Sequence, residues 1–166
     1  KMRRSSSFKV MDKLFLGSLS TIGECNFCRF LFDKFDPEAV WSAINNYSIC
    51  KGGQWKGSTI FWQQDGQGNV RGGKIMLYDV STGKRVKGES NKIGWVHTNH
   101  KIKNFDLRQC LFGLHLAISE SDKTIGVVES AKTAVIASIA MPDLVWVSTE
   151  GLRNINASRF QLLVNR

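Results

Sequence analysis

The sequence predicts a mixed α/β (α+β) chain in which a basic antiparallel sheet precedes an α/β unit with a parallel sheet core. Residues 125–128 form a short apolar run rich in β-branched side chains, and residues 144–148 repeat this pattern. Runs of this length and composition are typical of buried strands in parallel sheets. Residues 58–64 and 70–79 instead flank a polar turn at 65–69, which indicates an antiparallel hairpin.

We expect the chain to divide into three consecutive units. They are a helical amino-terminal segment (1–53), the basic antiparallel subdomain (54–104) and the α/β domain (105–166). In the first unit, residues 25–35 are apolar at helical spacing. Asp36 can cap a second helix whose first residue is Pro37. The basic, serine-rich residues 1–7 are expected to be disordered.

A lone glutamate follows the first of the predicted parallel strands. Residues 131–139 have the small-residue spacing of a helix packed on a sheet, and Pro142 ends that helix. Glu129 is therefore expected at the carboxyl end of a central strand, where open α/β sheets place their ligands. The alternative is that Glu129 only complements the dipole of the following helix. Glu150, after the next strand, is either a second oxygen ligand near Glu129 or a solvated turn carboxylate.

Three motifs of the α/β unit occur in a fixed order: LFGLHLA (111–117), VVES (127–130) and VWVSTEGL (145–152). They resemble the catalytic core of bacterial DnaG-type primases, in which a helix, a strand ending in glutamate and a second strand open the Toprim domain. Upstream, IFWQQDGQGNVRGGKIMLYD (60–79) is similar to the basic subdomain that precedes Toprim. The stretch from FWQQD to GKRVK also resembles an uncharacterised Toprim-like family of bacterial mobile elements.

The resemblance implies a DNA-binding, primase-like protein of replication or mobilisation, with Glu129 as a metal ligand or acid/base in Mg²⁺-dependent nucleotidyl transfer. The chain departs from the primase pattern, however. Ser130 replaces the usual glycine, Leu107 and Arg108 stand where primases carry a lysine, and the sequence contains no Asp-x-Asp pair. Because Mg²⁺ needs several oxygen ligands, we expect a truncated Toprim-like domain that is inactive as a nucleotidyltransferase. The alternative is a non-catalytic nucleic-acid-binding or protein-interaction module on a Toprim-like scaffold.

The charge distribution indicates an anionic partner. The chain has 23 Lys and Arg against 14 Asp and Glu, a net charge of +9. Residues 51–103 carry a net +7, whereas residues 104–166 are balanced. A basic block beside a neutral one is the pattern of a protein that binds a phosphate backbone. With the resemblance, this pattern predicts single-stranded DNA as the partner, and nucleotides, a helicase or other replication proteins as further partners.

Individual contacts to the nucleic acid are expected within and just after this basic block. We predict that phosphates are held by Arg71, Lys74, Lys84, Arg85 and Arg108. Trp62 is the preferred ring for stacking on a base, because aromatic rings beside cations bind single strands. Phe61 and Tyr78 are expected in the core of the sheet instead. His97 either touches phosphate or is a loop histidine without a function.

The cysteines have a close pair but no zinc pattern. Cys25 and Cys28 form a Cys-x-x-Cys motif, whereas Cys50 and Cys110 are isolated, and a structural zinc site needs four ligands. Zinc is therefore not expected, because the pair also lies in an apolar helical pattern. A redox function is not expected either, because the pair lacks the usual βαβ context. Nothing in these residues suggests a signal peptide, a membrane-spanning run or a disulfide framework. We therefore expect a cytoplasmic protein without a membrane partner.

Overall fold

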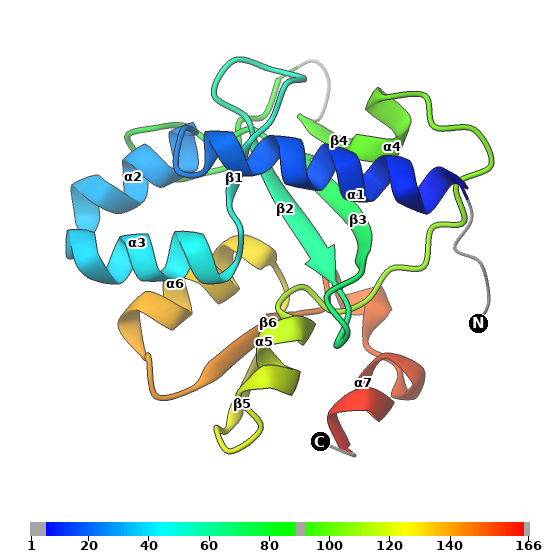
Figure 1. Ribbon diagram of the computed structural model, residues 1–166. Coiled ribbons are helices and arrows are strands. Elements are labelled where there is room, and N and C mark those ends of the chain that lie inside the picture. The colour runs from blue at the N-terminus through cyan, green and yellow to red at the C-terminus, as the bar shows by residue number, and fades with distance from the viewer. Residues whose placement is uncertain (1–5, 89–91, 165–166) are drawn as a thin grey trace.

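The computed structural model describes residues 6–88 and 92–164, and it places an antiparallel sheet above a smaller α/β unit in the view of Figure 1. The strands are β1 (Cys50–Lys51), β2 (Thr59–Gln64), β3 (Val70–Met76), β4 (Ile93–Trp95), β5 (Ile125–Val128) and β6 (Val145–Ser148). The α-helices are α1 (Ser6–Ser18), α2 (Asn26–Lys34), α3 (Pro37–Asn46), α4 (Val96–Asn99), α5 (Leu114–Ser119), α6 (Ala131–Ala140) and α7 (Ala157–Val164). Two short 3₁₀ helices, η1 (Leu19–Thr21) and η2 (Leu152–Asn154), join neighbouring elements.

The basic segment folds as the predicted antiparallel sheet, with the strand order β1-β2-β3-β4. β2 and β3 form the hairpin, with Phe61 opposite Lys74. Residues 84–87 do not add a strand to this sheet, because Arg85 makes only an isolated bridge to Tyr78. β4 pairs with the outer edge of β3 instead. A short strand separated from the hairpin by a long loop therefore completes the sheet.

β5 and β6 form the predicted parallel pair, and α6 connects them. Phe112 adds an antiparallel bridge to Ser148 on the other side of β6. Among the described residues, β5 pairs only with β6, and its Val127 is 46% exposed. The expectation that Glu129 ends a central, buried strand is therefore wrong. Within the part of the chain that the structure describes, Glu129 follows an edge strand of a two-stranded sheet.

The LFGLHLA motif is helical only in its second half. Gly113 has a φ of +81°, and α5 begins at the next residue, Leu114. A Cβ at position 113 would lie 2.6 Å from the backbone oxygen of Trp146. Glycine is therefore needed both for the left-handed conformation and for the close approach of β6.

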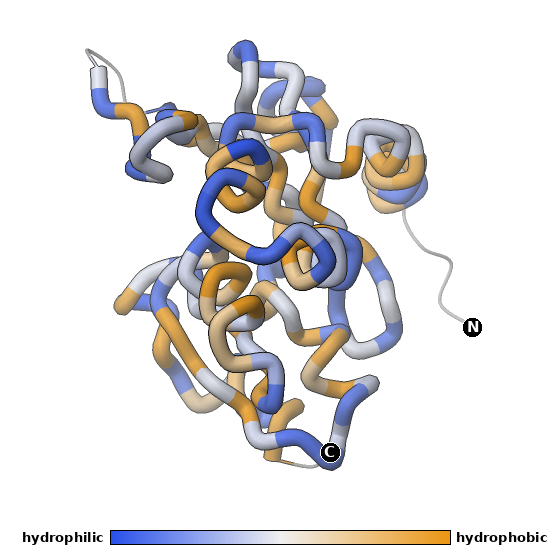
Figure 2. Tube along the Cα trace, turned by 90° about the vertical axis from the view of Figure 1, so that its left-hand side faces the viewer, coloured by the Kyte–Doolittle hydropathy of each residue, from blue (hydrophilic) through white to orange (hydrophobic). Residues whose placement is uncertain are grey.

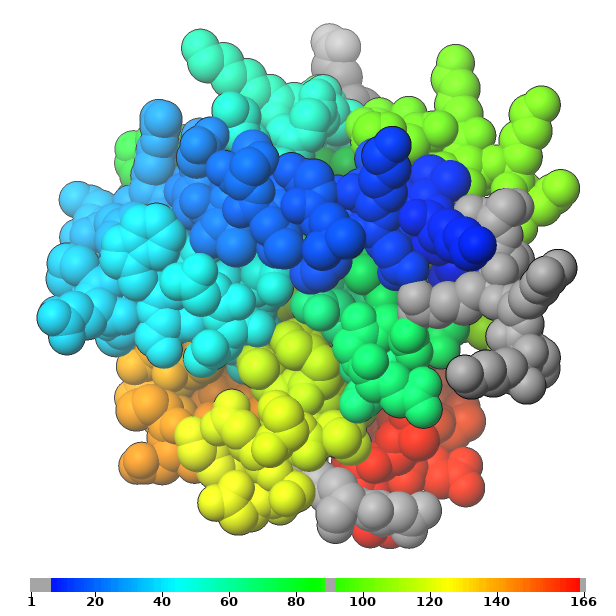
Figure 3. Space-filling model, viewed as in Figure 1, coloured from blue at the N-terminus to red at the C-terminus, as the bar shows by residue number. Residues whose placement is uncertain are grey.

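The amino-terminal segment is helical, as predicted. Asp36 caps α3, because its Oδ1 accepts hydrogen bonds from the N–H groups of Glu38 and Ala39, each at 3.0 Å. Helix α1 begins at Ser6 and forms a band across the upper face in Figure 3. The expectation of disorder for residues 1–7 is thus wrong for the last two of them, and residues 1–5 lie outside the described part.

Three apolar clusters hold these elements together. One joins α2, α3 and α6 with one face of the sheet, one lies between α1 and the other face, and one lies beside β6. In Figure 2 the helical turns alternate between apolar and hydrophilic residues, as expected for helices with one buried face. None of the described helices is long and apolar enough to cross a membrane.

Candidate junction and groove around the basic sheet

Lys74 of the basic sheet contacts the α/β unit. It lies opposite Phe61 on β2 and Trp95 on β4, and residues paired across antiparallel strands point to the same face. Phe61 packs against Phe112 of the α/β unit, with ring centroids 5.8 Å apart. The Nζ of Lys74 lies 2.7 Å from Oε2 of Glu150, and the two side chains are 18% and 4% exposed. Lys74 and Glu150 therefore form a largely buried ion pair between sheet and α/β unit.

Glu150 is held by two further groups. Its Oε1 accepts a hydrogen bond from the backbone N–H of Ala131 at 2.7 Å and another from the hydroxyl of Ser148 at 2.9 Å. Ala131 is the first residue of α6, where a carboxylate is favoured by the helix dipole and satisfies a free N–H. The φ of Glu150 is +59°, which costs a non-glycine residue roughly 1 kcal/mol. The interpretation of Glu150 as a solvated turn carboxylate is wrong, because its side chain is buried and bound.

Glu129 lies beside the junction formed by the Lys74–Glu150 ion pair. Its backbone carbonyl accepts a hydrogen bond from the N–H of Gly151 at 3.1 Å, so the turns that carry Glu129 and Glu150 lie at one sheet edge. The Glu129 residue is exposed, whereas both carboxylate oxygens of Glu150 are already bound. The described residues contain no group of three or more His, Cys, Asp or Glu side chains that could hold a metal ion. Because Mg²⁺ needs several oxygen ligands, these residues do not fit a magnesium site.

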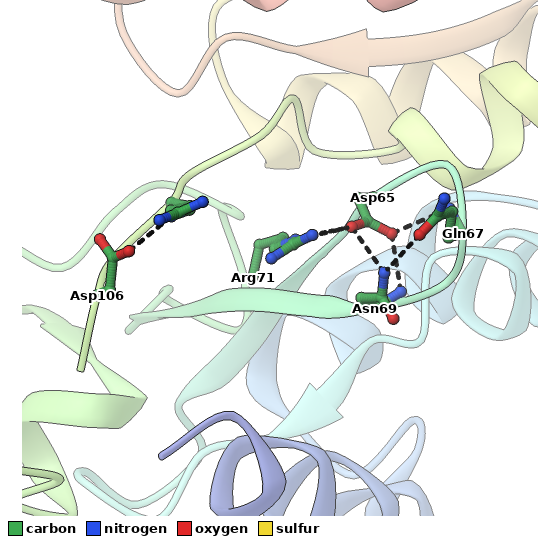
Figure 4. Close-up of polar contacts among 6 residues, drawn as sticks. Asp65, Gln67, Asn69, Arg71 and Asp106 are labelled. Carbon is green, nitrogen blue, oxygen red and sulfur yellow. Dashed lines mark hydrogen bonds and ion pairs between the residues drawn. The ribbon is translucent and has the colours of Figure 1, made fainter. Parts of the chain in front are cut away.

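Arg71 makes a different set of contacts from Lys74. Its Nη2 and Nε lie 2.6 and 2.7 Å from Oδ2 of Asp65, in the hairpin turn, and Figure 4 shows Arg71 directed toward Asp65. The guanidinium also lies over the ring of Phe8 in α1, 5.6 Å from its centroid. Arg71 therefore lies on the α1 side of the sheet, and Lys74 lies on the opposite side. Arg71 and Lys74 are thus each paired with a carboxylate, and as phosphate contacts they stay predictions.

Asp65 organises the hairpin turn in addition to pairing with Arg71. Its Oδ1 accepts hydrogen bonds from the N–H groups of Gln67 and Asn69, both at 2.9 Å. Burial alone would raise the pKa of Asp65, but the hydrogen bonds from Asn69, Gln67 and Arg71 outweigh it, and the pKa is lowered. The charge on Asp65 thus holds both the turn and the Arg71 side chain.

Trp62 cannot stack on a base in this structure, so that prediction is wrong. Only 1% of the residue is exposed, and its ring packs edge-on against Phe15 of α1 at 5.4 Å. Its Nε1 donates a hydrogen bond to the Ser18 hydroxyl at 3.0 Å. A Cβ at Gly73 would lie 2.9 Å from the Trp62 ring. Glycine at position 73 therefore leaves room for the Trp62 ring.

The remaining predicted contacts are spread over the surface. Lys84 and Arg85 are exposed in the turn that follows β3, and they stay predicted phosphate contacts. Arg108 is also exposed, and its Nε lies 2.6 Å from Oδ2 of Asp106. His97 stacks on Phe105, with centroids 5.0 Å apart, and burial lowers its pKa.

A groove that the sequence analysis missed lies along the outer edge of β4. It has a volume of about 380 Å³ and is lined by Gln54, Ile93, Gly94, Trp95, Thr98, Asn99 and Lys101. The sequence feature that could have indicated this groove is Trp95, an aromatic residue of the basic block close to the polar run HTNHK (97–101). The contribution of Gln54 was not visible, because it comes from a loop far from β4 in the chain.

Comparison with solved structures identifies the fold. A structure of the DnaG catalytic core matches with a TM-score of 0.61 and 16% identity, over 96% of this chain and 59% of that one. A DnaG primase catalytic domain bound to single-stranded DNA matches with a TM-score of 0.58 and 13% identity, over the same shares of the two chains. The chain thus spans 59% of the length of these primase structures. The predicted DnaG and Toprim-like fold is confirmed.

Sequence comparison assigns the chain to a family. No curated protein matches it. A family model described as a domain of unknown function, DUF6371, matches residues 25–166. The match covers the α2–α3 segment, the basic sheet and the α/β unit, so this chain belongs to the DUF6371 family.

Proposed function

We propose that this chain is the single-stranded-DNA-binding part of a primase-like replication or mobilisation protein, and that the groove beside β4 accepts a base. The groove carries the proposal: its lining includes an aromatic residue (Trp95), two amide residues (Gln54 and Asn99) and a lysine (Lys101). A volume of about 380 Å³ lies in the range of small-molecule sites. A ring beside a cation is the combination that binds single strands without reading their sequence.

Positive charge near the groove supports the proposal. Among the described residues, none of the ion pairs involves Lys56, Lys101 or Lys103, and all three are exposed. The Nζ of Lys92 lies over the ring of Trp55, 5.7 Å from its centroid. These cations can exchange their counterions for phosphates, whereas Arg71 and Lys74 are already neutralised by carboxylates.

The relationship to primases supports binding more than it supports catalysis. One solved primase domain with this fold is bound to single-stranded DNA. In the present chain, Glu150 is committed to Lys74 and to the start of α6. Glu129 as a metal ligand or acid/base in nucleotidyl transfer stays a prediction that requires metal ligands beyond the described residues. Nucleotides, a helicase and other replication proteins stay predicted partners.

The proposal is tested by fluorescence anisotropy with labelled single-stranded and duplex DNA over a salt series. We expect single strands to bind, and Lys101→Ala to reduce the slope of log K against log salt by about 0.7, the value for one phosphate contact. Trp95→Ala should weaken binding by about 1–3 kcal/mol, the contribution of one stacked base. A circular dichroism spectrum of each variant checks that the fold is retained.

Arg29→Ala is the matched control, because it also removes one exposed positive charge that no ion pair of the described residues neutralises. Arg29 belongs to α2, on the opposite side of the molecule from α4 in Figure 1. Binding by this variant should equal that of the unchanged chain. If neither DNA binds at low salt, the proposal fails and the protein-interaction module becomes the better interpretation. If Arg29→Ala and Lys101→Ala weaken binding equally, binding is general electrostatic attraction and the groove is not the site.

A further inference from the structure

Cys25 and Cys28 occupy special positions at the start of α2. The helix begins at Asn26, and Cys25 precedes it with an extended backbone, at φ −128° and ψ 165°. The sulfur of Cys25 accepts a hydrogen bond from the backbone N–H of Cys28 at 3.4 Å. Cys25 is therefore the residue that caps the helix. The expectation that both cysteines lie inside an apolar helix is wrong for Cys25.

The two sulfur atoms are already close enough to react with each other. They lie 3.1 Å apart and share a hydrogen bond, whereas a disulfide bond is about 2.05 Å long. An approach of roughly 1 Å would join them, and rotation of the two side chains supplies such a movement. Cys50, on the neighbouring strand β1, is also buried, but its thiol is turned to the backbone oxygen of Ser48 at 3.3 Å.

The environment shifts the pKa values of the two thiols in opposite directions. The pKa of Cys25 is lowered, first because of its hydrogen bond with Cys28 and against the effect of burial. The pKa of Cys28 is raised by the same hydrogen bond and by burial. Because a thiolate is the reactive form of cysteine, the lowered pKa favours Cys25 over Cys28 as the nucleophile of the pair.

Burial determines which oxidant can reach the pair. Cys25 is 1% exposed and Cys28 is not exposed at all, so a folded protein cannot dock on either sulfur. The intervening Asn26 ties this turn to the sheet, since its backbone N–H donates to Gly57 O at 2.9 Å and its side chain donates to Tyr78 O at 3.1 Å. A small peroxide can enter when the first turn of α2 opens locally, because helix ends open more easily than helix centres.

We propose that Cys25 and Cys28 form a reversible dithiol–disulfide site that is oxidised by hydrogen peroxide. The Cys25 thiolate attacks the O–O bond and becomes a sulfenic acid, and the other oxygen leaves as water after taking a proton. The Cys28 sulfur then displaces the sulfenic oxygen, which leaves as a second water, and the S–S bond forms. Two thiols are oxidised to one disulfide while one peroxide is reduced to two waters. A small dithiol reverses the reaction by exchange.

The test uses the full chain, reduced and then exposed to hydrogen peroxide in the presence of free glutathione. After quenching, the protein is denatured, alkylated with iodoacetamide and analysed by peptide mass spectrometry. We expect Cys25 and Cys28 to lose alkylation together and their peptide to become lighter by two hydrogens. Cys50 and Cys110 should remain alkylated, and dithiothreitol should restore both lost sites.

Two variants sharpen the result. Cys28→Ser should form no internal disulfide and should leave a Cys25 sulfenic acid that dimedone labels. Cys50→Ser, which changes another buried cysteine, should still form the disulfide. The proposal is overturned if the pair stays fully alkylated when glutathione has been consumed, if Cys25 pairs with Cys50, or if Cys25 is oxidised to a sulfonic acid without a disulfide. The mass-spectrometric test on the unchanged chain gives its result without either variant. It also involves no DNA.

Discussion

Two ion pairs on strand β3 differ in what they hold together. Arg71 pairs with Asp65 in the turn of its own hairpin, while Lys74 pairs with Glu150 at the end of β6. The first pair is 27% and 13% exposed, and the second is 18% and 4% exposed. A pair within one hairpin stabilises that hairpin. A pair between the sheet and the α/β unit forms only when both have packed, so it fixes their relative position.

Breaking the junction should therefore have the largest effect. Lys74→Met leaves the Glu150 carboxylate buried without its counter-charge, and we expect the free energy of unfolding to fall by about 3–5 kcal/mol. Urea denaturation followed by circular dichroism measures this loss. The double variant Lys74→Met/Glu150→Leu should recover part of the stability, because no buried charge is then unpaired. A loss below about 1 kcal/mol for the single variant would show that the pair is not buried in solution.

Breaking the hairpin pair should cost less. Asp65→Asn removes the charge that Arg71 and the turn N–H groups bind, and we expect a loss of about 1–2 kcal/mol at pH 7. Because the folded pKa of Asp65 is lowered, the unfolded chain binds more protons near pH 4, and stability falls as the pH drops below that value. The variant should lack this contribution to acid sensitivity. Urea denaturation at pH 7 and at pH 3 distinguishes Asp65→Asn from the unchanged chain. If the substitution lowers the free energy of unfolding equally at both pH values, the lowered pKa of Asp65 is contradicted.

A third contact tests the link between α3 and α5. The Nε2 of His115 lies 3.0 Å from the backbone oxygen of Asn46, and its buried Nδ1 has no hydrogen-bond partner among the described residues. Burial lowers the pKa of His115. The unfolded chain therefore binds more protons below about pH 6.5, and the free energy of unfolding should decrease from pH 7 to pH 5.

His115→Gln should reduce this dependence on pH without abolishing it. The pKa of His97 is also lowered by burial, so His97 contributes with the same sign. Thermal unfolding followed at half-unit steps between pH 5 and pH 7 measures both contributions. An unchanged pH profile in His115→Gln would mean that the His115 ring is solvated, and the proposed α3–α5 link would then be absent.

Local patterns in the sequence were sufficient for most of the elements. Asp36 followed by Pro37 marks the start of α3, because a side-chain cap and a residue without an N–H suit the first helical turn. The β2–β3 hairpin and the β5 and β6 strands were equally visible from alternation and short apolar runs. Their shared basis is that caps, turns and side-chain periods act over a few residues. Strand alternation also held an unused signal, since a regular strand places residues three apart, such as Arg71 and Lys74, on opposite faces.

The sequence by itself determined the α2–α3 pair, the β2–β3 hairpin and the β5–α6–β6 unit, the basic character of the sheet and the resemblance to the primase fold. Only the tertiary structure decided which polar side chains remain available. Trp62 is buried because α1 covers it, and Lys74 is neutralised because Glu150 arrives from β6. Cys25 and Cys28 meet because α2 begins between them. Burial and charge pairing depend on neighbours that are distant in the chain, and these neighbours are set by packing.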